Sequence, residues 1–264
     1  MKFYDPRDAI IKERFRNIKY TVLIGSGKGG VGKSTISAIL ALKLSREGFN
    51  VGLLDLDLHG PVIPEILGLE NTEPEESKKG LVPPETLGVK VMSIGFFAKN
   101  EAIPLRGKAK TNAIKELLAI TNWGSLDFLV VDLPPGTGDE TLTSVESING
   151  SKGALIVTIP SRISLSVVER AIRLFSDLKV PILALINNMA YYVIAGERAF
   201  IIGEGNVFSL ANKYNIEYVI EIPFDFKIAK ALDENAPEKL LETEVAERIG
   251  KIVEILKSKV ERRS

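Results

Sequence analysis

The feature that most constrains this chain is a glycine-rich segment at residues 25–35, which reads G-S-G-K-G-G-V-G-K-S-T. An apolar run at 20–24 precedes it, and a helical pattern with one apolar face follows it. Gly27, Gly32, Lys33 and Ser34 match the pattern G-x-x-x-x-G-K-[ST], which has meaning only between a strand and a helix. The segment therefore predicts a phosphate-binding loop.

The residue types in this loop indicate its chemistry. Glycines let successive backbone N–H groups turn inward and form a concavity for anions, which a Cβ would obstruct. The N-terminus of the following helix adds unpaired donors and a partial positive charge. We expect Lys33 to reach the β- and γ-phosphates of a nucleotide and the hydroxyl of Ser34 to bind Mg²⁺. A glycine-rich turn without chemical function is the alternative, and it leaves the strand and the helix on either side unexplained.

Composition limits the other function classes. Lys and Arg total 34, as do Asp and Glu, so the overall charge gives no reason to expect nucleic acid or an anionic membrane as a partner. The start of the chain has no apolar secretory segment, and no apolar run is long enough to span a bilayer. We therefore expect a cytoplasmic protein. Because the chain has no cysteine, disulfides, thiolate metal sites and cysteine nucleophiles are excluded.

Apolar runs recur along the chain and are mostly continuous, which is typical of strands buried on both faces of a parallel sheet. They lie at 20–24, 51–54, 89–94, 128–131, 154–159, 182–186 and 218–222. Helical patterns lie between them, at 108–120, 165–178 and 207–214. This alternation predicts a three-layer, doubly wound α/β fold with a mostly parallel sheet.

We expect residues 1–264 to form one domain, with a short N-terminal helix at about 5–17 and a C-terminal helix at about 239–262. Asp5 is the expected N-cap of the first helix. Residues 71–80 are predicted to be a mobile surface loop. The C-terminal helix has an apolar stripe and basic last turns, so it fits either packing on the sheet or binding at a membrane surface. The stripe consists of Val245, Ile249, Ile252, Val253, Leu256 and Val260.

Carboxylates follow two of the predicted strands. Asp55 and Asp57 end the run at 51–54, and Asp132 ends the run at 128–131. In open parallel sheets, ligands bind at this carboxyl edge. Asp132 therefore fits a residue that holds Mg²⁺ directly or through water, and Asp57 fits one that orients an attacking water. Either carboxylate alone can also cap a turn. The loop at 133–139, with two prolines and two glycines, is suited to sensing the γ-phosphate.

The second lysine of the phosphate loop, Lys28, makes the loop similar to the deviant Walker A motif of the MinD/ParA ATPases. That resemblance implies an ATP-dependent homodimer in which Lys28 reaches the partner's nucleotide. Three segments together resemble the Mrp (ApbC) ATPases, a group of iron–sulfur cluster carriers or scaffolds within this superfamily. They are D-L-P-P-G-T-G-D at 132–139, G-K-G-G-V-G-K-S-T at 27–35 and D-L-D-L-H-G-P at 55–61. Matches at 5–7, 106–107, 188–189 and 222–225 extend the resemblance over nearly the whole chain.

The resemblance also implies roles for individual residues. Lys28, Lys33 and Asp57 are the expected catalytic residues, and Ser34, Asp55 and Asp132 are the expected magnesium site. Among the expected nucleotide-binding residues, Asn188 and the 223–225 segment are expected to frame the adenine. The full set is Gly27, Lys28, Gly29, Gly30, Val31, Gly32, Lys33, Ser34, Thr35, Asn188, Pro223 and Asp225.

One part of the family pattern is missing. Cluster-carrying members place C-x-x-C shortly after the N-M motif, so that two chains offer four thiolates. Here the residues after Asn188 and Met189 contain no cysteine, and aliphatic Ile194 and Ala195 cannot bind iron. His59 is one residue in a different motif, and we expect it to be a polar loop residue. No residue is therefore assigned to an iron–sulfur cluster. The resemblance carries over the ATPase and does not carry over cysteine-ligated cluster binding.

The leading hypothesis is a homodimeric Mrp-type ATPase that binds ATP and Mg²⁺ and hydrolyses ATP slowly. It would act in iron–sulfur cluster assembly or transfer, together with client or scaffold proteins that supply the sulfur ligands. The alternative is a positioning ATPase of the ParA or MinD kind, whose ATP-bound dimer binds DNA or a membrane. A reductase that passes electrons through a cluster conflicts with the absence of cysteine. A P-loop small-molecule kinase has no identifiable acceptor pocket in the sequence.

Overall fold

The structure is a computed structural model that describes residues 5–97, 106–203 and 205–261. Within these residues the main sheet has eight strands, in the order β12-β9-β8-β1-β7-β2-β6-β5. All neighbours pair in parallel except β5, which is antiparallel to β6. The strands of this sheet are β1 Ile18–Ser26, β2 Val51–Asp55, β5 Glu85–Thr86, β6 Val89–Ser93, β7 Leu126–Asp132, β8 Lys152–Thr158, β9 Ile182–Asn187 and β12 Val219–Glu221.

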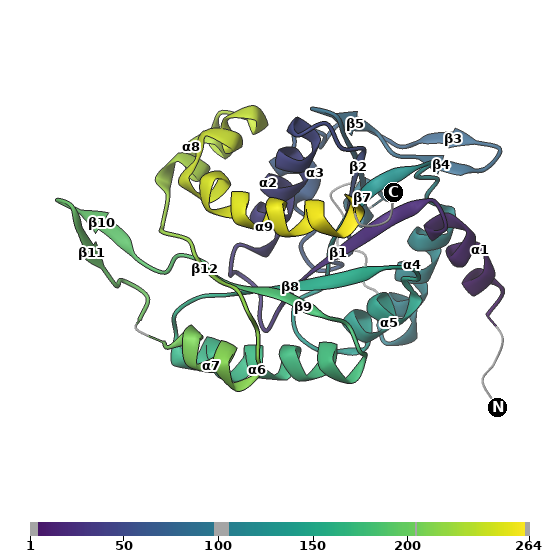
Figure 1. Cartoon of the computed structure of the whole chain (residues 1–264). Helices are drawn as coiled ribbons and strands as arrows, with labels where there is room; N and C mark the ends of the chain where they lie inside the picture. Colours follow the sequence, from purple (N-terminus) through teal and green to yellow (C-terminus); the bar gives the residue numbers. More distant parts are fainter. Residues whose placement is uncertain (1–4, 98–105, 204, 262–264) are drawn as a thin grey trace.

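Helices cover both faces of the sheet. Figure 1 shows α2, α8 and α9 over one face and α4, α5, α6 and α7 over the other. This arrangement confirms the predicted three-layer, doubly wound, mostly parallel fold. The helices are α1 Pro6–Phe15, α2 Lys33–Arg46, α3 Ile63–Ile66, α4 Lys108–Ile120, α5 Asp139–Ser147, α6 Arg162–Asp177, α7 Val207–Lys213, α8 Phe226–Asp233 and α9 Glu244–Glu261, with short 3₁₀ turns at Ile94–Phe97 and Pro237–Glu242.

The central strands carry apolar side chains on both faces because helices lie on both sides. Every residue of β2 is buried, and so is every residue of β7 except Asp127. Helix ends are fixed by local side chains: Asp5 caps α1, as predicted, and Ser161 caps α6. Gly48, with φ +88°, follows the end of α2, where a left-handed residue ends a helix.

The C-terminal helix α9 has its apolar stripe in the core. The stripe residues, from Val245 to Val260, are all buried, and the helix packs beside α2. This confirms packing within the fold and excludes the alternative in which the same stripe lies on a membrane. Among the described helices, none combines the length and the apolar character needed to cross a bilayer.

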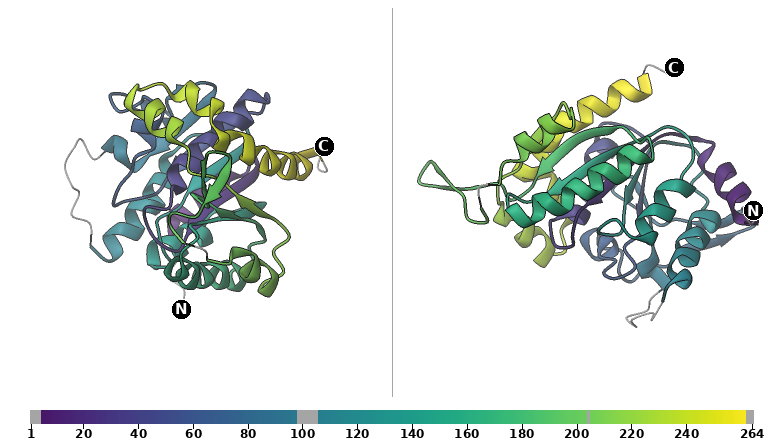
Figure 2. Two further views of the ribbon diagram at one scale, coloured as in Figure 1. Left: turned by 90° about the vertical axis from the view of Figure 1, so that its left-hand side faces the viewer. Right: turned by 90° about the horizontal axis from the view of Figure 1, so that it is seen from below.

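Two segments differ from the sequence-based expectation. Residues 71–80, predicted to be a mobile surface loop, contain β3 (Glu75–Ser77), which pairs with β4 (Gly80–Val82) in a small separate sheet. The turn is stabilised because Ser77 Oγ donates to the carbonyl of Gly80, whose φ is +110°. The second segment is a hairpin of β10 (Tyr192–Ile194) and β11 (Glu197–Ala199), which projects from the body at one end in Figures 1 and 2.

Candidate nucleotide-binding site

The predicted phosphate loop joins the end of β1 to the start of α2, as the motif requires. Its glycines are constrained in different ways. Gly30 and Gly32 have φ of +74° and +84°, in the left-handed region that favours glycine. At Gly27 a Cβ would lie 2.7 Å from the backbone of Val167 in α6, and at Gly32 it would lie 2.3 Å from Nδ2 of Asn188. The loop is therefore held between its own helix, α6 and the end of β9.

The base of the loop contains a buried polar cluster around Asp132. Nζ of Lys33 lies 2.7 Å from Asp132 Oδ2, and the Lys33 side chain is 6% exposed. Ser34 Oγ donates to the same oxygen at 2.6 Å, and Ser37 Oγ lies 2.7 Å from Oδ1. The lysine is close enough to form an ion pair but is not aligned for a hydrogen bond, so its buried donors are unsatisfied within the described residues. A buried, unsatisfied ammonium group beside a glycine-rich loop fits a phosphate ligand.

Asp55 lies beside Asp132 because the two residues are partners in the parallel pairing of β2 with β7. Its carboxylate is fully buried and accepts hydrogen bonds from the backbone N–H of Asp57 and from Ser93 Oγ. Burial, and then the neighbouring Asp132 carboxylate, raise the pKa of Asp55. Two carboxylates next to one lysine leave this edge of the sheet suited to binding an additional cation.

Asp57 lies in the first turn beyond β2 and is half-buried. Its Oδ1 accepts hydrogen bonds from the backbone N–H groups of His59 and Gly60, at 3.1 and 3.4 Å. The carboxylate therefore fixes the turn that carries it, and the turn is joined to Asp55 through the N–H of Asp57. The structure places Asp57 two residues after the buried Asp55, at the carboxyl edge of the sheet.

The loop at 133–139 lies directly against the phosphate loop. The N–H of Gly136 donates to the carbonyl of Ser26 at 3.0 Å, and that of Leu133 donates to the carbonyl of Ile24. The hydroxyl of Thr141 lies 3.2 and 3.1 Å from the carbonyl oxygens of Pro134 and Gly136. The hydrogen bond from Gly136 to Ser26 therefore joins this loop directly to the start of the phosphate loop.

The expected adenine-framing residues occupy different settings. Asn188 touches the phosphate loop itself, because its Nδ2 donates to the carbonyl of Val31 at 2.8 Å. Pro223 is buried. The carboxylate of Asp225 caps α8 through the N–H of Lys227 and also accepts from the N–H of Glu244, so both of its oxygens hold helix ends. The structure thus brings Asn188 to the loop and gives Asp225 a capping contact that sequence reasoning did not predict.

Three other expected residues complete the loop. Lys28 is half-buried, and Ser26 Oγ donates to the Lys28 carbonyl. Gly29 is exposed and has open space where a Cβ would stand, while Thr35 lies in the first turn of α2. Sequence reasoning missed Ser37 and Ser93. Ser37 stands four residues after Lys33, on the same face of α2, and this helical spacing is a signal that could have identified it.

No group of three or more His, Asp or Glu side chains in the described part of the chain is arranged to hold a metal ion. The donor set at the phosphate loop is instead one hydroxyl and two carboxylates, from Ser34, Asp55 and Asp132. Magnesium prefers oxygen ligands and usually takes one or two carboxylates together with substrate phosphates and water. The residues present therefore fit Mg²⁺ that arrives with a nucleotide, not a site made by the protein alone.

The hairpin of β10 and β11 occupies the place where the family pattern would have cysteines. Its turn is Ala195–Gly196, both with positive φ, which is typical of a tight two-residue hairpin. Val193 and Ile194 are about half exposed. Val193, Ile194 and Ala195 are apolar and offer no metal ligand, and the hairpin contains no cysteine.

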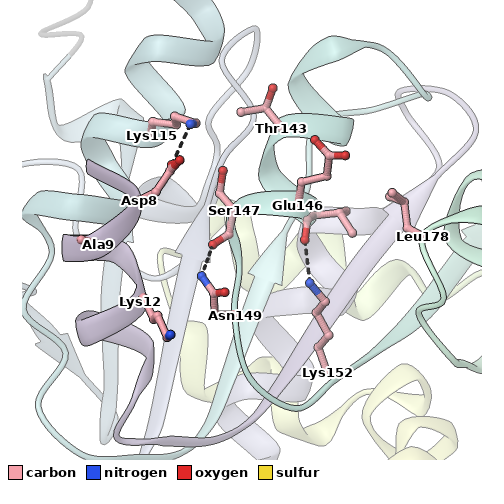
Figure 3. Close-up of a pocket in the computed structure, with 11 residues that line it drawn as sticks. Asp8, Ala9, Lys12, Lys115, Thr143, Glu146, Ser147, Asn149, Lys152 and Leu178 are labelled. Carbon is pink, nitrogen blue, oxygen red and sulfur yellow. Dashed lines mark hydrogen bonds and ion pairs between the residues drawn. The ribbon is translucent and has the colours of Figure 1, made fainter. Parts of the chain in front are cut away.

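A separate cavity of about 870 Å³ lies at the amino edge of the sheet, away from the phosphate loop. Figure 3 shows its lining from α1, α4, α5 and the start of β8. Two of its lysines have internal partners: Lys152 donates to the carbonyl oxygens of Val145 and Ile148 at the end of α5, and Lys115 donates to Asp8. We assign this cavity to the packing of α1 and α5 against the sheet.

Known proteins resemble this chain over nearly its whole length. A family model described as ParA, NUBPL iron-transfer P-loop NTPase, matches residues 17–260. The iron–sulfur cluster carrier protein of Methanocaldococcus jannaschii is 40% identical over 265 residues, which covers 98% of this chain and 91% of that protein. The protein of the same name from Aquifex aeolicus is 38% identical, with 95% and 70% covered.

Solved structures give a consistent result. A nucleotide-binding protein from Archaeoglobus fulgidus, in complex with ADP, is 41% identical and has a TM-score of 0.77, with 88% of this chain and 92% of that chain covered. The cell division ATPase MinD of Pyrococcus furiosus has a TM-score of 0.60 at 18% identity, with 89% and 100% covered, and this likeness concerns the fold alone.

Proposed function

Because the chain belongs to the ParA family of P-loop NTPases, in its NUBPL iron-transfer group, we propose that it binds and slowly hydrolyses Mg²⁺-ATP and uses this cycle in iron–sulfur cluster assembly or transfer. The family confirms the resemblance that the sequence motifs indicated. The single observation that carries the nucleotide part is the buried cluster of Lys33, Ser34 and Asp132 beneath the phosphate loop. The names of the relatives support the iron–sulfur part.

The residues take distinct roles in the proposed reaction. The backbone N–H groups of residues 27–35 and the ammonium of Lys33 hold the phosphates, and they stabilise the charge that develops on the phosphoryl oxygens. Ser34, Asp132 and Asp55 would hold Mg²⁺, which would supply further positive charge at the phosphates. Asp57 orients the attacking water. The cleavage transfers the phosphoryl group to water and releases ADP and phosphate.

We further propose that the active species is a homodimer. Lys28 is half-buried beside the exposed Gly29 and Gly30, so a second copy is able to approach it, and this exposure supports the role that the family resemblance gives it. Adenine would lie near Asn188 and Pro223, with Asp225 holding the adjoining end of α8. The chain has no cysteine, so the sulfur ligands of any transferred cluster come from a partner protein.

The first test is nucleotide binding and hydrolysis by Lys33→Ala. Loss of the ammonium should weaken Mg²⁺-ATP binding at least about tenfold and abolish hydrolysis, because no other described lysine lies in the buried cluster. Calorimetric titration and phosphate release measure the two effects. Lys78→Ala, in the β3–β4 turn, is the matched control.

A buried aspartate without its lysine also destabilises the fold, so Ser34→Ala provides a second variant that keeps the ion pair. ATP affinity equal to wild type in both variants, with normal unfolding temperatures, would refute the proposed site. In parallel, anaerobic incubation of the purified chain with iron and sulfide should give no cluster absorbance unless a cysteine-containing partner is added. A stable chromophore on the chain alone would contradict the proposal that a partner supplies the ligands.

A further inference from the structure

Three polar side chains from different elements form a connected chain outside the phosphate loop. They are His59, in the turn after β2, Lys110, in the first turn of α4, and Glu140, in the first turn of α5. Nζ of Lys110 lies 2.8 Å from His59 Nε2 and 3.1 Å from Glu140 Oε1. We call this group the Lys110 bridge. Nothing in the motifs predicts it, because its members are far apart in sequence.

The His59 end of the bridge holds the turn that carries Asp57. The backbone N–H of His59 donates to Asp57 Oδ1 at 3.1 Å, and the N–H of Asp57 donates to Asp55 Oδ1 at 3.1 Å. Fixing the imidazole therefore fixes the peptide group against which the Asp57 carboxylate is oriented. Without that restraint, an exposed turn is free to move with its carboxylate.

The Glu140 end holds the loop at 133–139. Glu140 is followed by Thr141, whose hydroxyl contacts the carbonyl oxygens of Pro134 and Gly136. Gly136 in turn donates to Ser26 at the start of the phosphate loop. The bridge therefore connects the loops after two neighbouring strands, β2 and β7, which lie on the same side of the phosphate loop in the sheet.

Helix α4, which carries Lys110, is anchored to the N-terminal segment. Further along α4, Lys115 forms ion pairs with Asp5 and Asp8 of the N-terminal segment, at 3.1 and 2.7 Å. Arg7 donates to Asn112 on the same helix. Lys110 thus stands on a helix that is anchored by α1 and that also packs against α5.

The chemistry of the three groups determines their protonation. An ammonium group only donates hydrogen bonds, so Nε2 of His59 accepts in this arrangement and the imidazole proton lies on Nδ1. Glu140 is an ionised partner: burial raises its pKa, but the stronger combined effect of its own backbone N–H and of Lys110 lowers it. The ammonium thus lies between the imidazole nitrogen of His59 and the carboxylate of Glu140.

We propose that Lys110 is a positioning residue for ATP hydrolysis, which holds the Asp57 turn and the 133–139 loop in one fixed relation through His59 and Glu140. This inference rests on the proposed function. Lys110 does not touch the phosphate cluster, so its effect falls on the orientation of Asp57 and not on the affinity for the nucleotide. Small displacements of a catalytic group are sufficient to slow a reaction strongly.

The kinetic test uses Lys110→Met, Lys110→Arg and, as matched control, Lys108→Met on the same helix turn. We expect Lys110→Met to lower kcat about tenfold and to change KM for ATP less than about twofold. Lys110→Arg should restore at least part of kcat, and Lys108→Met should match wild type. Thermal unfolding should be the same for all four proteins within about 2 °C, because partly exposed ion pairs contribute little stability. The double variant Lys110→Met with Glu140→Gln should be no slower than Lys110→Met alone, since both remove one bridge.

A second readout is independent of activity. His59 is the only histidine of the chain, so the imidazole ¹⁵N spectrum contains one residue. Wild type should show the proton on Nδ1, and Lys110→Met should show a mixture of tautomers. Unchanged imidazole signals in Lys110→Met would overturn the bridge, and a normal kcat would overturn its kinetic role; either result would leave the proposed function intact. A wild-type chain that does not hydrolyse ATP would overturn the proposed function and the kinetic role together, and the imidazole spectrum would still decide whether the bridge exists.

Discussion

At the scale of single residues, the glycines of the phosphate loop differ in what they do, and this gives a direct prediction. Gly27→Ala should lower the free energy of unfolding by about 1–3 kcal/mol, because the new Cβ would meet the backbone of α6, which cannot rotate away as a side chain can. Gly29→Ala should change it by less than about 0.5 kcal/mol, since nothing lies within 4 Å of its Cβ position. Denaturant unfolding without nucleotide measures both. Equal stability of the two variants would contradict the packing role of Gly27.

The same scale shows what the sequence could and could not indicate about the site. Lys33 and Ser34 belong to a local motif whose spacing carries its own geometry, so their convergence was predictable. Asp132 and Asp55 were predictable because buried parallel strands end at one edge. Ser93 and Lys110 were not, since their contacts depend on how a neighbouring strand and a covering helix are placed in three dimensions. Asp225 was predicted to bind the nucleotide. The structure shows that its carboxylate caps α8, a role that an aspartate just before a helix commonly takes.

At the scale of elements, the docking of α1 on α4 should depend on pH. The side-chain hydrogen bond from Arg7, assisted by Lys115, holds the pKa of Asp5 well below its usual range. A group whose folded pKa is lowered stabilises the fold fully above its unfolded pKa, here 3.8, and loses that contribution as the pH falls below it. Asp5→Asn keeps the N-cap and removes the charge, so it should cost about 0.5–1 kcal/mol at pH 7.

The measurement compares thermal unfolding of wild type and Asp5→Asn from pH 7 to pH 2. Their difference should shrink below about pH 4, where Asp5 of the unfolded chain is increasingly protonated. Asp233→Asn, an exposed carboxylate at the end of α8, is the control. A difference that stays constant over the whole range would show that the charge of Asp5 does not stabilise α1.

The elements themselves were largely predictable, and the failures share a cause. Long apolar runs and helical patterns such as 108–120 gave strands and helices close to their observed bounds, because burial on both faces leaves a strong signal. The β3–β4 pair and the β10–β11 hairpin were missed. Their strands are three residues long and mostly polar or exposed, so they have no apolar alternation, and turn geometry at Gly80 and Gly196 determines them.

At the scale of the whole molecule, the proposed dimer predicts a nucleotide-dependent mass. With ATP and the slowed variant Asp57→Asn, light scattering should give twice the 28.9 kDa of one chain, and without nucleotide it should give one chain. Adding Lys28→Ala should keep the protein monomeric while Lys33 still binds ATP. Lys78→Ala should dimerise normally. A dimer that forms equally well with Lys28→Ala would remove that lysine from the interface.

One further consequence follows from how the three central strands are aligned. Ile24 and Asp132 are partners between β1 and β7, and Asp132 and Asp55 are partners between β7 and β2. A slip of one residue in β2 would move Asp55 about 3.3 Å and turn its carboxylate to the opposite face. The affinity for the nucleotide would therefore decrease if β2 lost this alignment with β7. Replacement of a core residue such as Leu53, which never meets the ligand, would be detected first as weaker binding wherever it loosens that alignment.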